Sequence, residues 1–484
     1  MSKIFARLAY GYIALPILIF FIGWCNPLVA ILGSIILLTS FYFACKNAPE
    51  LWYPTSKKQL FFLLSLVVIA LIWVCWSGIG ALVFQNPDHK CRNPIFELLV
   101  THNWPVTASF RKGFFSTIEH PIVMTYYIGF WLPPALVGKL FNSVQVGYYA
   151  QIIWATLGVF LVFYYILASV KRKNYLPIFL FLIFSGMDFL GASLLKKFYL
   201  YPLVRNIEWW LAGFNYESFT TQLFWVFNQA LPAWLMTVML LHEKNNKSIL
   251  FLYSCLLIHA TLPSMGLFPI VAYLMLKNGN SPSKDWFTFN YIKDCIKSAF
   301  TFQNTLGMFL ITVISYFYLS QNISGGNMGL AQHLWFNILV YMIVYFPIEV
   351  GIYLAVVWRY NKNNPLLYLI TAWLLIIPHI QVGFTIDFGM RACIPSLVIL
   401  FLFVAKTLDE GKIQKDKFAY TILILALIIG SISPLHEFSR TVIRTSRGIT
   451  KAKSELSVPN FFAYIQDNKF LMYFGKKPKG VVGE

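Results

Sequence analysis

The sequence LFFLLSLVVIALIWVCWSGIGALV, residues 60–83, decides the fold class. It contains no charged residue and is long enough for a helix to cross a bilayer, which takes about 20 residues. Similar runs recur along the 484 residues, of which 58% are hydrophobic and only 12% charged. Only helices and closed barrels satisfy their backbone in lipid, and these runs are too continuous for barrel strands. We therefore predict an all-α, polytopic transmembrane helical bundle.

The apolar runs predict about 13 spans with additional interfacial helices. Two runs precede residues 60–83, and the others follow after a long polar interruption. We treat residues 1–433 as one bundle and residues 434–484 as a polar, basic C-terminal tail. The further runs cover about 8–23, 28–45, 145–170, 175–195, 222–241, 248–261, 264–276, 306–320, 335–357, 365–380, 391–406 and 418–433.

Segment 121–140 decides the topology. Pro133 and Pro134 lie in its middle and strongly disfavour a straight span, so we expect a kinked or re-entrant segment. The basic run 171–173 then faces the cytoplasm, as the positive-inside rule requires. If the segment crosses fully, that run lies outside and the basic residues divide almost evenly between the two sides. The favoured topology leaves the basic tail outside, against the rule.

The span at 60–83 delivers a long polar loop, QNPDHKCRNPIFELLVTHNWPVTASFRKGFFSTIEHP (85–121), to the non-cytoplasmic side. The loop opens with Asp88, His89 and Arg92. Next, the pair at 93–94, asparagine followed by proline, is typical of a helix start, and the apolar residues after it share one helical face. We expect a short helix lying in the membrane interface.

Two further polar clusters reach the same side of the membrane. One holds Arg205, Glu208, Trp209, Trp210 and Glu217, and the other holds Asp387 and Arg391. Carboxylates at the mouth of a bundle can act as general bases, and arginines can clamp phosphate. The two tryptophans could stack on a sugar or anchor the chain at the interface. The simpler interpretation is that these charges are solvated and that Arg391 pairs with Asp387 or extends to the headgroups.

Several classes of function are disfavoured. The seven cysteines show no metal-ligand or redox spacing, and the histidines of the polar loop lack the spacing of a zinc site. No Walker, G-x-S-x-G or H-E-x-x-H motif is present in the sequence. The net charge of +19 is dispersed between apolar runs, so we expect attraction to anionic headgroups and no nucleic-acid partner. We predict no cofactor; a divalent metal is not excluded, but no motif indicates one.

The layout resembles that of the GT-C glycosyltransferases. In these, too, an early span delivers an outside loop with an acidic residue near its start, and interfacial helices and many spans follow. The segment HPIVMTYYIGFWLPPALVGKLF (120–141) is similar to the part that follows this loop in such enzymes. EWWL (208–211), TTQLFWVFNQALPAWL (220–235) and DFGMRACIPSL (387–397) look like segments of uncharacterised polytopic bacterial membrane proteins.

This resemblance implies transfer of a sugar from a polyprenyl-phosphate donor to an acceptor on the outer face of a bacterial plasma membrane. Asp88 occupies the place of the catalytic acid. The partners would be the lipid-linked sugar donor and membrane lipids. The resemblance, together with the clusters, assigns substrate binding to His89, Arg92, Arg205, Glu208, Trp209, Trp210, Asp387 and Arg391.

Two acids inside apolar runs support other hypotheses. Asp188 and Glu349 are costly in a membrane, and such residues mark function or specific pairing. A secondary transporter or a flippase of lipid-linked glycans therefore stays open. A polymerase or ligase of the O-antigen type shares the outside arginines and also stays open.

Overall fold

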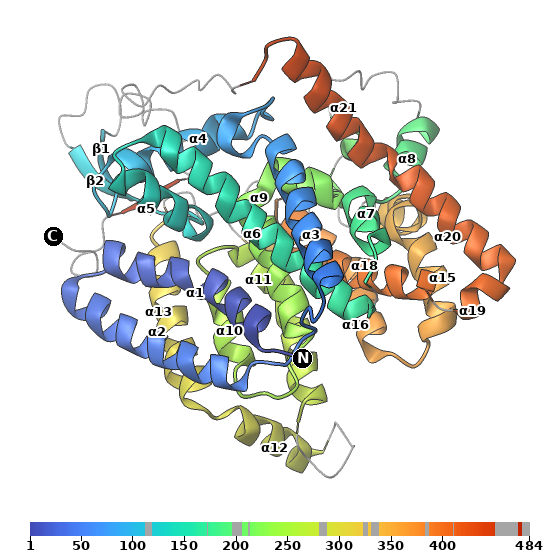
Figure 1. The fold of residues 1–484 in the computed structure, drawn as a ribbon, viewed down its shortest axis with the longest axis horizontal. Coiled ribbons are helices and arrows are strands. Elements are labelled where there is room, and N and C mark those ends of the chain that lie inside the picture. The colour runs from blue at the N-terminus through green and yellow to red at the C-terminus, as the bar shows by residue number, and fades with distance from the viewer. Residues whose placement is uncertain are drawn as a thin grey trace.

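The computed structural model describes residues 1–111, 119–171, 173–195, 206–211, 213–279, 288–322, 328–330, 338–382, 387–409, 411–450 and 473–476. Figure 1 shows a helical bundle, which confirms the predicted all-α membrane architecture. Within the described ranges, eight helices are long and apolar enough to cross a membrane, or nine if one bent pair counts as a single span. The count of about 13 spans expected from the apolar runs is not confirmed.

The first half of the chain contains α1 (Ile4–Trp24), α2 (Pro27–Asn47), α3 (Lys57–Trp76), η1 (Ile79–Ala81), α4 (His89–Thr101), β1 (Thr107–Arg111), β2 (Glu119–Met124), η2 (Gly129–Trp131), α5 (Leu132–Leu140), α6 (Val144–Val170), α7 (Leu176–Ile183), α8 (Asp188–Leu194), η4 (Ile207–Trp209) and α9 (Phe219–Leu240). The second half contains α10 (Ile249–Cys255), α11 (Thr261–Lys277), α12 (Phe289–Ala299), η5 (Gln303–Gly307), α13 (Met308–Leu319), β3 (Met328–Leu330), η6 (Tyr341–Tyr345), η7 (Pro347–Gly351), α15 (Ile352–Asn361), α16 (Pro365–Ile376), η8 (Ile377–His379), β4 (Ile380–Val382), α17 (Asp387–Ala392), α18 (Ile394–Asp409), α19 (Gly411–Lys415), α20 (Lys417–Gly430), α21 (Ile432–Ser446) and β5 (Phe474–Lys476).

Segment 121–140 does not form a straight span, as the double proline predicts. It continues β2, turns through η2 and ends in α5, a helix of nine residues that begins beside Pro133 and Pro134. Nine residues rise only about 14 Å, less than half of the hydrocarbon thickness. The short helix packs against α4 and α6.

The expected short helix is present, but it begins five residues earlier than predicted. α4 starts at His89 with Asp88 in the N-cap position, and Pro94 lies inside the helix. Arg92 pairs with Asp88 across one helical turn at 3.0 Å, which supports the first turn ahead of the proline. The asparagine–proline pair was therefore wrong as a start signal.

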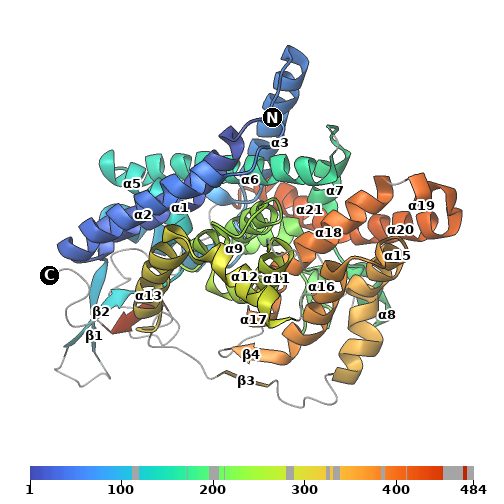
Figure 2. The same ribbon diagram turned by 90° about the horizontal axis from the view of Figure 1, so that it is seen from below.

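A small sheet beside α4 was not predicted. β1 and β2 form an antiparallel hairpin, and β5 from the C-terminal tail pairs with the other edge of β2, with Val123 opposite Gly475. Figure 2 shows these strands together at one end of the molecule. The tail therefore returns to the polar loop, and its first part forms α21.

The centre of the bundle is α9, in which every residue is buried. Trp234 of α9 stacks on Trp73 of α3 at 5.9 Å and 4°, and Trp73 stacks on Phe163 of α6. The Trp73 indole also donates to Thr220 Oγ1 at 3.2 Å. These contacts bind three spans into one core around α9, because aromatic pairs contribute energy beyond the area they bury.

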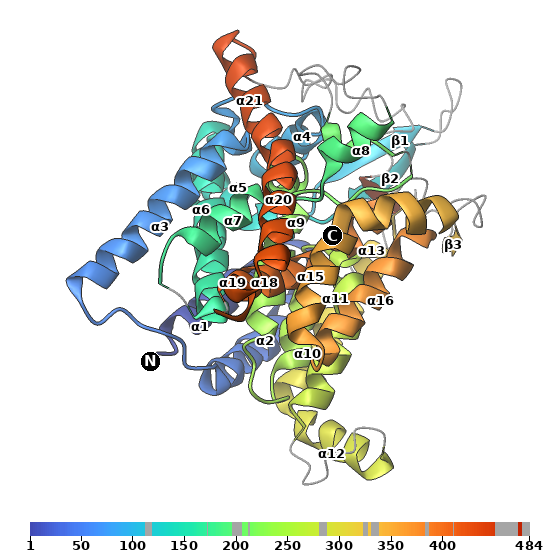
Figure 3. The same cartoon turned by 90° about the vertical axis from the view of Figure 1, so that its right-hand side faces the viewer.

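The polar elements gather on one side of the bundle. Figure 3 shows α4, α8, α21 and the hairpin on one side, and the N-terminus and α12 on the opposite side. α12 is amphipathic. Its residues Phe289 and Ile296, and Phe300 at its C-terminal end, are exposed, whereas Tyr291 and Cys295 are buried. This matches an interfacial helix on the side of the N-terminus.

Gly266 provides the first test, because it sets the position of α17. A Cβ at Gly266 would lie 1.8 Å from the carbonyl oxygen of Ala392, whereas one at Gly389 would meet only Pro378 Cα at 3.5 Å. Gly266→Ala should therefore push α17 away from α11 and cost about 1–3 kcal/mol of stability, as overpacking does. The measurement is thermal unfolding in detergent, with Gly389→Ala as the matched control. A Gly266→Ala protein that melts like the wild type would contradict this packing.

Candidate functional site

Arg391 is one of two buried cations in the group of side chains predicted to bind substrate. Its side chain is 10% exposed, and Nη2 lies 3.4 Å from Oδ1 of Asp387, in the same short helix α17. Burial alone would lower the pKa of Arg391, but Asp387, the tyrosine pair 126–127 and Asp88 outweigh burial and raise it. Arg391 Nε has no hydrogen-bond partner among the described residues. A buried cation here therefore retains an unused donor.

Arg92 forms a second pair of the same kind. Its side chain is 6% exposed, and Nη2 lies 3.0 Å from Asp88 Oδ2. The guanidinium also lies over the ring of Phe227, 5.9 Å from its centroid. Neither Nε nor Nη1 of Arg92 finds a partner in the part of the chain that the structure describes. Asp88, by contrast, is 41% exposed and within reach of a ligand.

Tyr126 interacts electrostatically with both arginines. Burial raises the pKa of Tyr126, whereas the charges of Arg391 and Arg92 both lower it. Its backbone is fixed by Tyr318, whose hydroxyl accepts from the Tyr126 N–H and donates to the Tyr126 carbonyl, both at 3.1 Å. The ion pairs Asp88–Arg92 and Asp387–Arg391, from distant parts of the chain, therefore both act on one tyrosine.

Glu217 joins this arginine cluster from the start of α9. It is buried, and Asn215 Nδ2 donates to its Oε1 at 3.1 Å and to Met390 Sδ of α17 at 3.4 Å. Burial raises the pKa of Glu217 to about 8, assisted by Asp88 and opposed by Arg391. The group is thus mostly neutral at pH 7. The sequence placed Glu217 in a polar cluster without a role.

Glu208 is a buried acid outside the arginine cluster. It accepts from Thr221 Oγ1 at 2.8 Å and from the Ser218 N–H at 3.3 Å. Burial raises the pKa of Glu208 well above its usual value, and the charges of Asp188 and Glu217 raise it further. Glu208 therefore interacts with Glu217, which in turn interacts with Arg391.

The predicted tryptophan pair is split by the structure. Trp210 is buried, donates to Glu349 Oε1 at 2.7 Å and stacks on Tyr345 at 5.4 Å. Trp209 is 47% exposed, and its ring lies 5.6 Å from that of Trp225. Only Trp209 presents an accessible aromatic face, while Trp210 is part of the core.

His89 packs against Phe227, the ring over which Arg92 lies. It is buried, stacks on Phe227 at 5.5 Å, and its two ring nitrogens lie 3.2 Å from Gln85 Nε2 and from the Phe224 carbonyl. Burial, assisted by the charge of Arg92, lowers the pKa of His89 to about 3, so the ring is neutral. Arg205 lies outside the described residues.

Arg440 was missed by the sequence reasoning. This buried residue of α21 donates to Glu437 and, at 2.5 Å, to Asn86, two residues before Asp88. Its guanidinium also lies 5.1 Å from the ring centroid of Trp225. The spacing of Glu437 and Arg440 in the predicted tail could have indicated this helix, because residues three apart pair on one helix face.

No group of metal-ligating side chains is found within the described ranges. The arrangement is instead one of two buried guanidiniums, two accessible carboxylates and one buried carboxylic acid. No family model, curated protein or solved structure matches this chain.

Glu217 provides the second test. A folded-state pKa of about 8 means that the carboxyl stabilises the fold most below its usual pKa of 4.5 and loses that contribution as pH rises through 8. Glu217→Gln should remove this loss, a difference on the order of 3 kcal/mol at pH 7. The Tm advantage of the variant over wild type should grow from pH 5 to pH 8. Asp294→Asn on α12 is the control, and parallel Tm curves would disprove the burial effect.

Proposed function

We propose that the protein is a membrane glycosyltransferase that moves a sugar from a polyprenyl-phosphate donor to an acceptor on the non-cytoplasmic face. One observation carries the proposal. Arg92 and Arg391, from distant parts of the chain, are buried around Tyr126 with guanidinium donors that have no partner among the described residues. Buried polar groups of this kind are costly unless a ligand uses them.

A phosphate fits the two arginines chemically. Guanidinium groups bind phosphate oxygens through charge-assisted hydrogen bonds, which strengthen where water is excluded. Asp88 and Asp387 orient the two cations from their accessible sides. Glu217 stays mostly neutral at pH 7 and so adds little repulsion toward an anion. The arginines would stabilise the charge that develops on the phosphate as the sugar leaves.

Asp88 is assigned as the general base. It would take the proton of the acceptor hydroxyl as the acceptor oxygen bonds to the anomeric carbon and the bond from that carbon to the phosphate oxygen breaks. Its exposure lets an acceptor approach, and its pairing with Arg92 holds the carboxylate in place. The lipid phosphate leaves with the bonding electron pair.

The remaining predicted residues act around this centre. Trp209 offers a ring for sugar stacking, and Glu208 shapes the buried side through Ser218 and Thr221. His89 and Trp210 hold neighbouring side chains in place. Arg205 is proposed as a further donor to the phosphate.

The architecture proposed with this function is that of a GT-C-type bundle with about 13 crossings. The long helices would be joined in the membrane by shorter apolar ones, including α11 and α16. The loop 85–121 would face the outside of a bacterial plasma membrane, with no cofactor required. The lipid-linked donor would enter from the bilayer.

Substitution of the base and of the phosphate ligand tests the proposal. Purified protein is supplied with a panel of radiolabelled polyprenyl-phosphate sugars and a membrane-extract acceptor. Asp88→Asn should lower kcat by about 10²–10⁴, the usual contribution of a general base. Arg391→Gln should raise the KM for the donor. Transfer by Asp88→Asn at the wild-type rate would remove Asp88 from the mechanism.

The controls lie away from the site. Asp294→Asn is on α12, and Arg359→Gln breaks the exposed pair that Arg359 makes with Asp416 at 2.9 Å. Both should transfer sugar at the wild-type rate. Product size separates the related hypothesis of an O-antigen-type polymerase or ligase, because single-sugar addition differs from chain growth and from en bloc transfer.

A second candidate function, a transporter or flippase of lipid-linked glycans, is favoured by a buried acid pair. Asp188 accepts from Ser185 and Ser433, and the neighbouring acid Glu349 accepts from the Trp210 indole. Both acids belong to candidate spans. Such a pair is suited to proton coupling.

Proteoliposomes with an imposed pH gradient test this alternative. Proton-dependent movement of a fluorescent lipid-linked glycan, abolished by Asp188→Asn, would support it when no sugar transfer is detected. Transfer activity without such movement would reject it.

A further inference from the structure

A groove of about 430 Å³ runs along α1, and none of its lining residues belongs to the arginine cluster. α1 provides its floor, α2 one wall and α6 the other. The floor is opened by Gly11, the walls are formed by Leu38 and Phe41 of α2 and Trp154 of α6, and Arg7 lies at one end. Its volume is typical of a site for a small organic ligand, about 300–1,000 Å³.

The groove follows from the packing of α2. This helix packs against α1 and η5, while α6 packs against α3, α5 and α9. α2 and α6 therefore leave the middle of α1 uncovered between them. Leu8, Leu15 and Leu38 remain 41%, 42% and 51% exposed at this place. An apolar groove on a membrane-spanning helix is open to lipid chains rather than to water.

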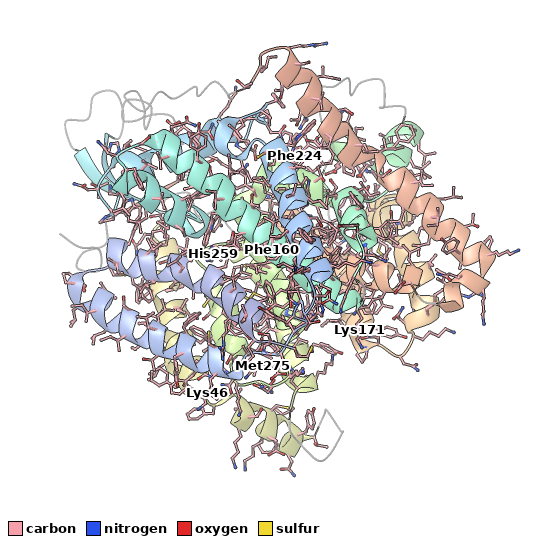
Figure 4. The ribbon with its side chains drawn as sticks, viewed as in Figure 1. Lys46, Phe160, Lys171, Phe224, His259 and Met275 are labelled. Atoms are coloured by element: carbon pink, nitrogen blue, oxygen red, sulfur yellow. The ribbon has the colours of Figure 1, made fainter. Side chains whose placement is uncertain are left out.

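Three cations surround one end of the groove. Lys3 donates to the Lys46 carbonyl at 2.8 Å, and Arg7 Nε donates to the Cys45 carbonyl at 3.2 Å. Figure 4 shows Lys46 at the end of α2 that lies beside the start of α1. Arg7 and Lys46 are exposed. The apolar groove thus ends in a basic surface suited to an anionic headgroup.

The length of the groove indicates what it holds. Along α1 it extends from Arg7 to Leu18, and a helix rises about 1.5 Å per residue, so the groove is about 16 Å long. That is about half of the roughly 30 Å hydrocarbon core of a bilayer. A chain lying in it with its headgroup at Arg7 would end near the bilayer midplane. This is the geometry of a lipid of one leaflet.

We propose that this groove binds one anionic phospholipid from the leaflet at the N-terminal end of α1. One acyl chain lies between α2 and α6 on the floor at Gly11, and the phosphate lies among Lys3, Arg7 and Lys46. The stacked rings of Tyr12 and Trp154, 4.1 Å apart, give the chain a flat apolar contact. The site is separate from the arginine cluster and does not depend on the proposed sugar transfer.

Photo-labelling of the full-length protein tests the site. Nanodiscs of phosphatidylcholine contain a small fraction of phosphatidylglycerol with a diazirine on its acyl chain, and adducts are mapped by peptide mass spectrometry. Labelling should concentrate on α1, α2 and α6 around Gly11, Phe41 and Trp154. A neutral phosphatidylcholine probe should label the groove more weakly.

Two variants sharpen the result. A Cβ at Gly11 meets only Phe41 Cζ at 3.9 Å, so Gly11→Phe should fold and fill the groove, and groove labelling should fall to the level of α3. Ile35→Phe, on an exposed part of α2 outside the groove, is its control. Arg7→Gln should lower the preference for phosphatidylglycerol about five-fold, the effect of one basic residue at an anionic surface, whereas Lys57→Gln should not.

Three outcomes would overturn the proposal. Groove labelling equal to that on exposed α3, and unchanged in Gly11→Phe, would show only bulk lipid. Equal labelling by the two headgroups would remove the basic residues from recognition. Cross-links between the α1 helices of two copies would show that a second copy covers the groove. Thermal unfolding of each variant confirms that the labelled protein is folded.

Discussion

The burial of Arg391 is the constraint on which the polar half of the structure depends. A guanidinium removed from water needs anions and donors arranged around it, since an unpaired buried charge costs several kcal/mol, on the order of a whole domain's stability. Asp387 supplies one anion from the same helix, and Asp88 adds another from the loop after α3. The close approach of α17 to Gly266 fixes where the guanidinium can lie. The loop, the tyrosine segment and α17 must therefore be placed together.

Three buried acids, Glu217, Glu208 and Asp188, extend this constraint into the bundle. Glu217 interacts with Asp88 on one side and with Glu208 on the other, and Glu208 interacts with Asp188. Within the described residues each of the three buried acids leaves one carboxyl oxygen without a donor. Burial raises the pKa values of Glu217 and Glu208, which favours their neutral forms and reduces the negative charge of the interior. The arginines can then attract an anion that a row of ionised carboxylates would repel.

Hydropathy predicted apolar helices and not their packing partners. α6, α9 and α11 lie within a few residues of the expected apolar runs, because burial in lipid requires continuous apolar sequence. The pairing of β2 with β5, and of Arg440 with Asn86, joins segments far apart in the chain, for which periodicity carries no signal. The bond from Trp210 to Glu349 is of the same kind, so neighbouring tryptophans acquired different surroundings. Charge is rare in this sequence, so Asp88 and Arg391 stood out as candidates, and the resemblance then singled out Asp88. The burial of Glu217 depends on neighbours that only the fold supplies.

α1 joins the lipid groove to the arginine cluster. Its Ile13 carbonyl lies 3.1 Å from Nε2 of His259, the buried residue labelled beside α1 in Figure 4. The same imidazole packs so closely on Gly129 that a Cβ there would lie 2.8 Å from Nδ1. Gly129 follows the tyrosine pair by two residues. α1, the floor of the groove, and the backbone that positions Tyr126 therefore both contact the His259 side chain. A close-packed interior has no free space, so a shift of α1 by the width of a methyl group must be absorbed at both places.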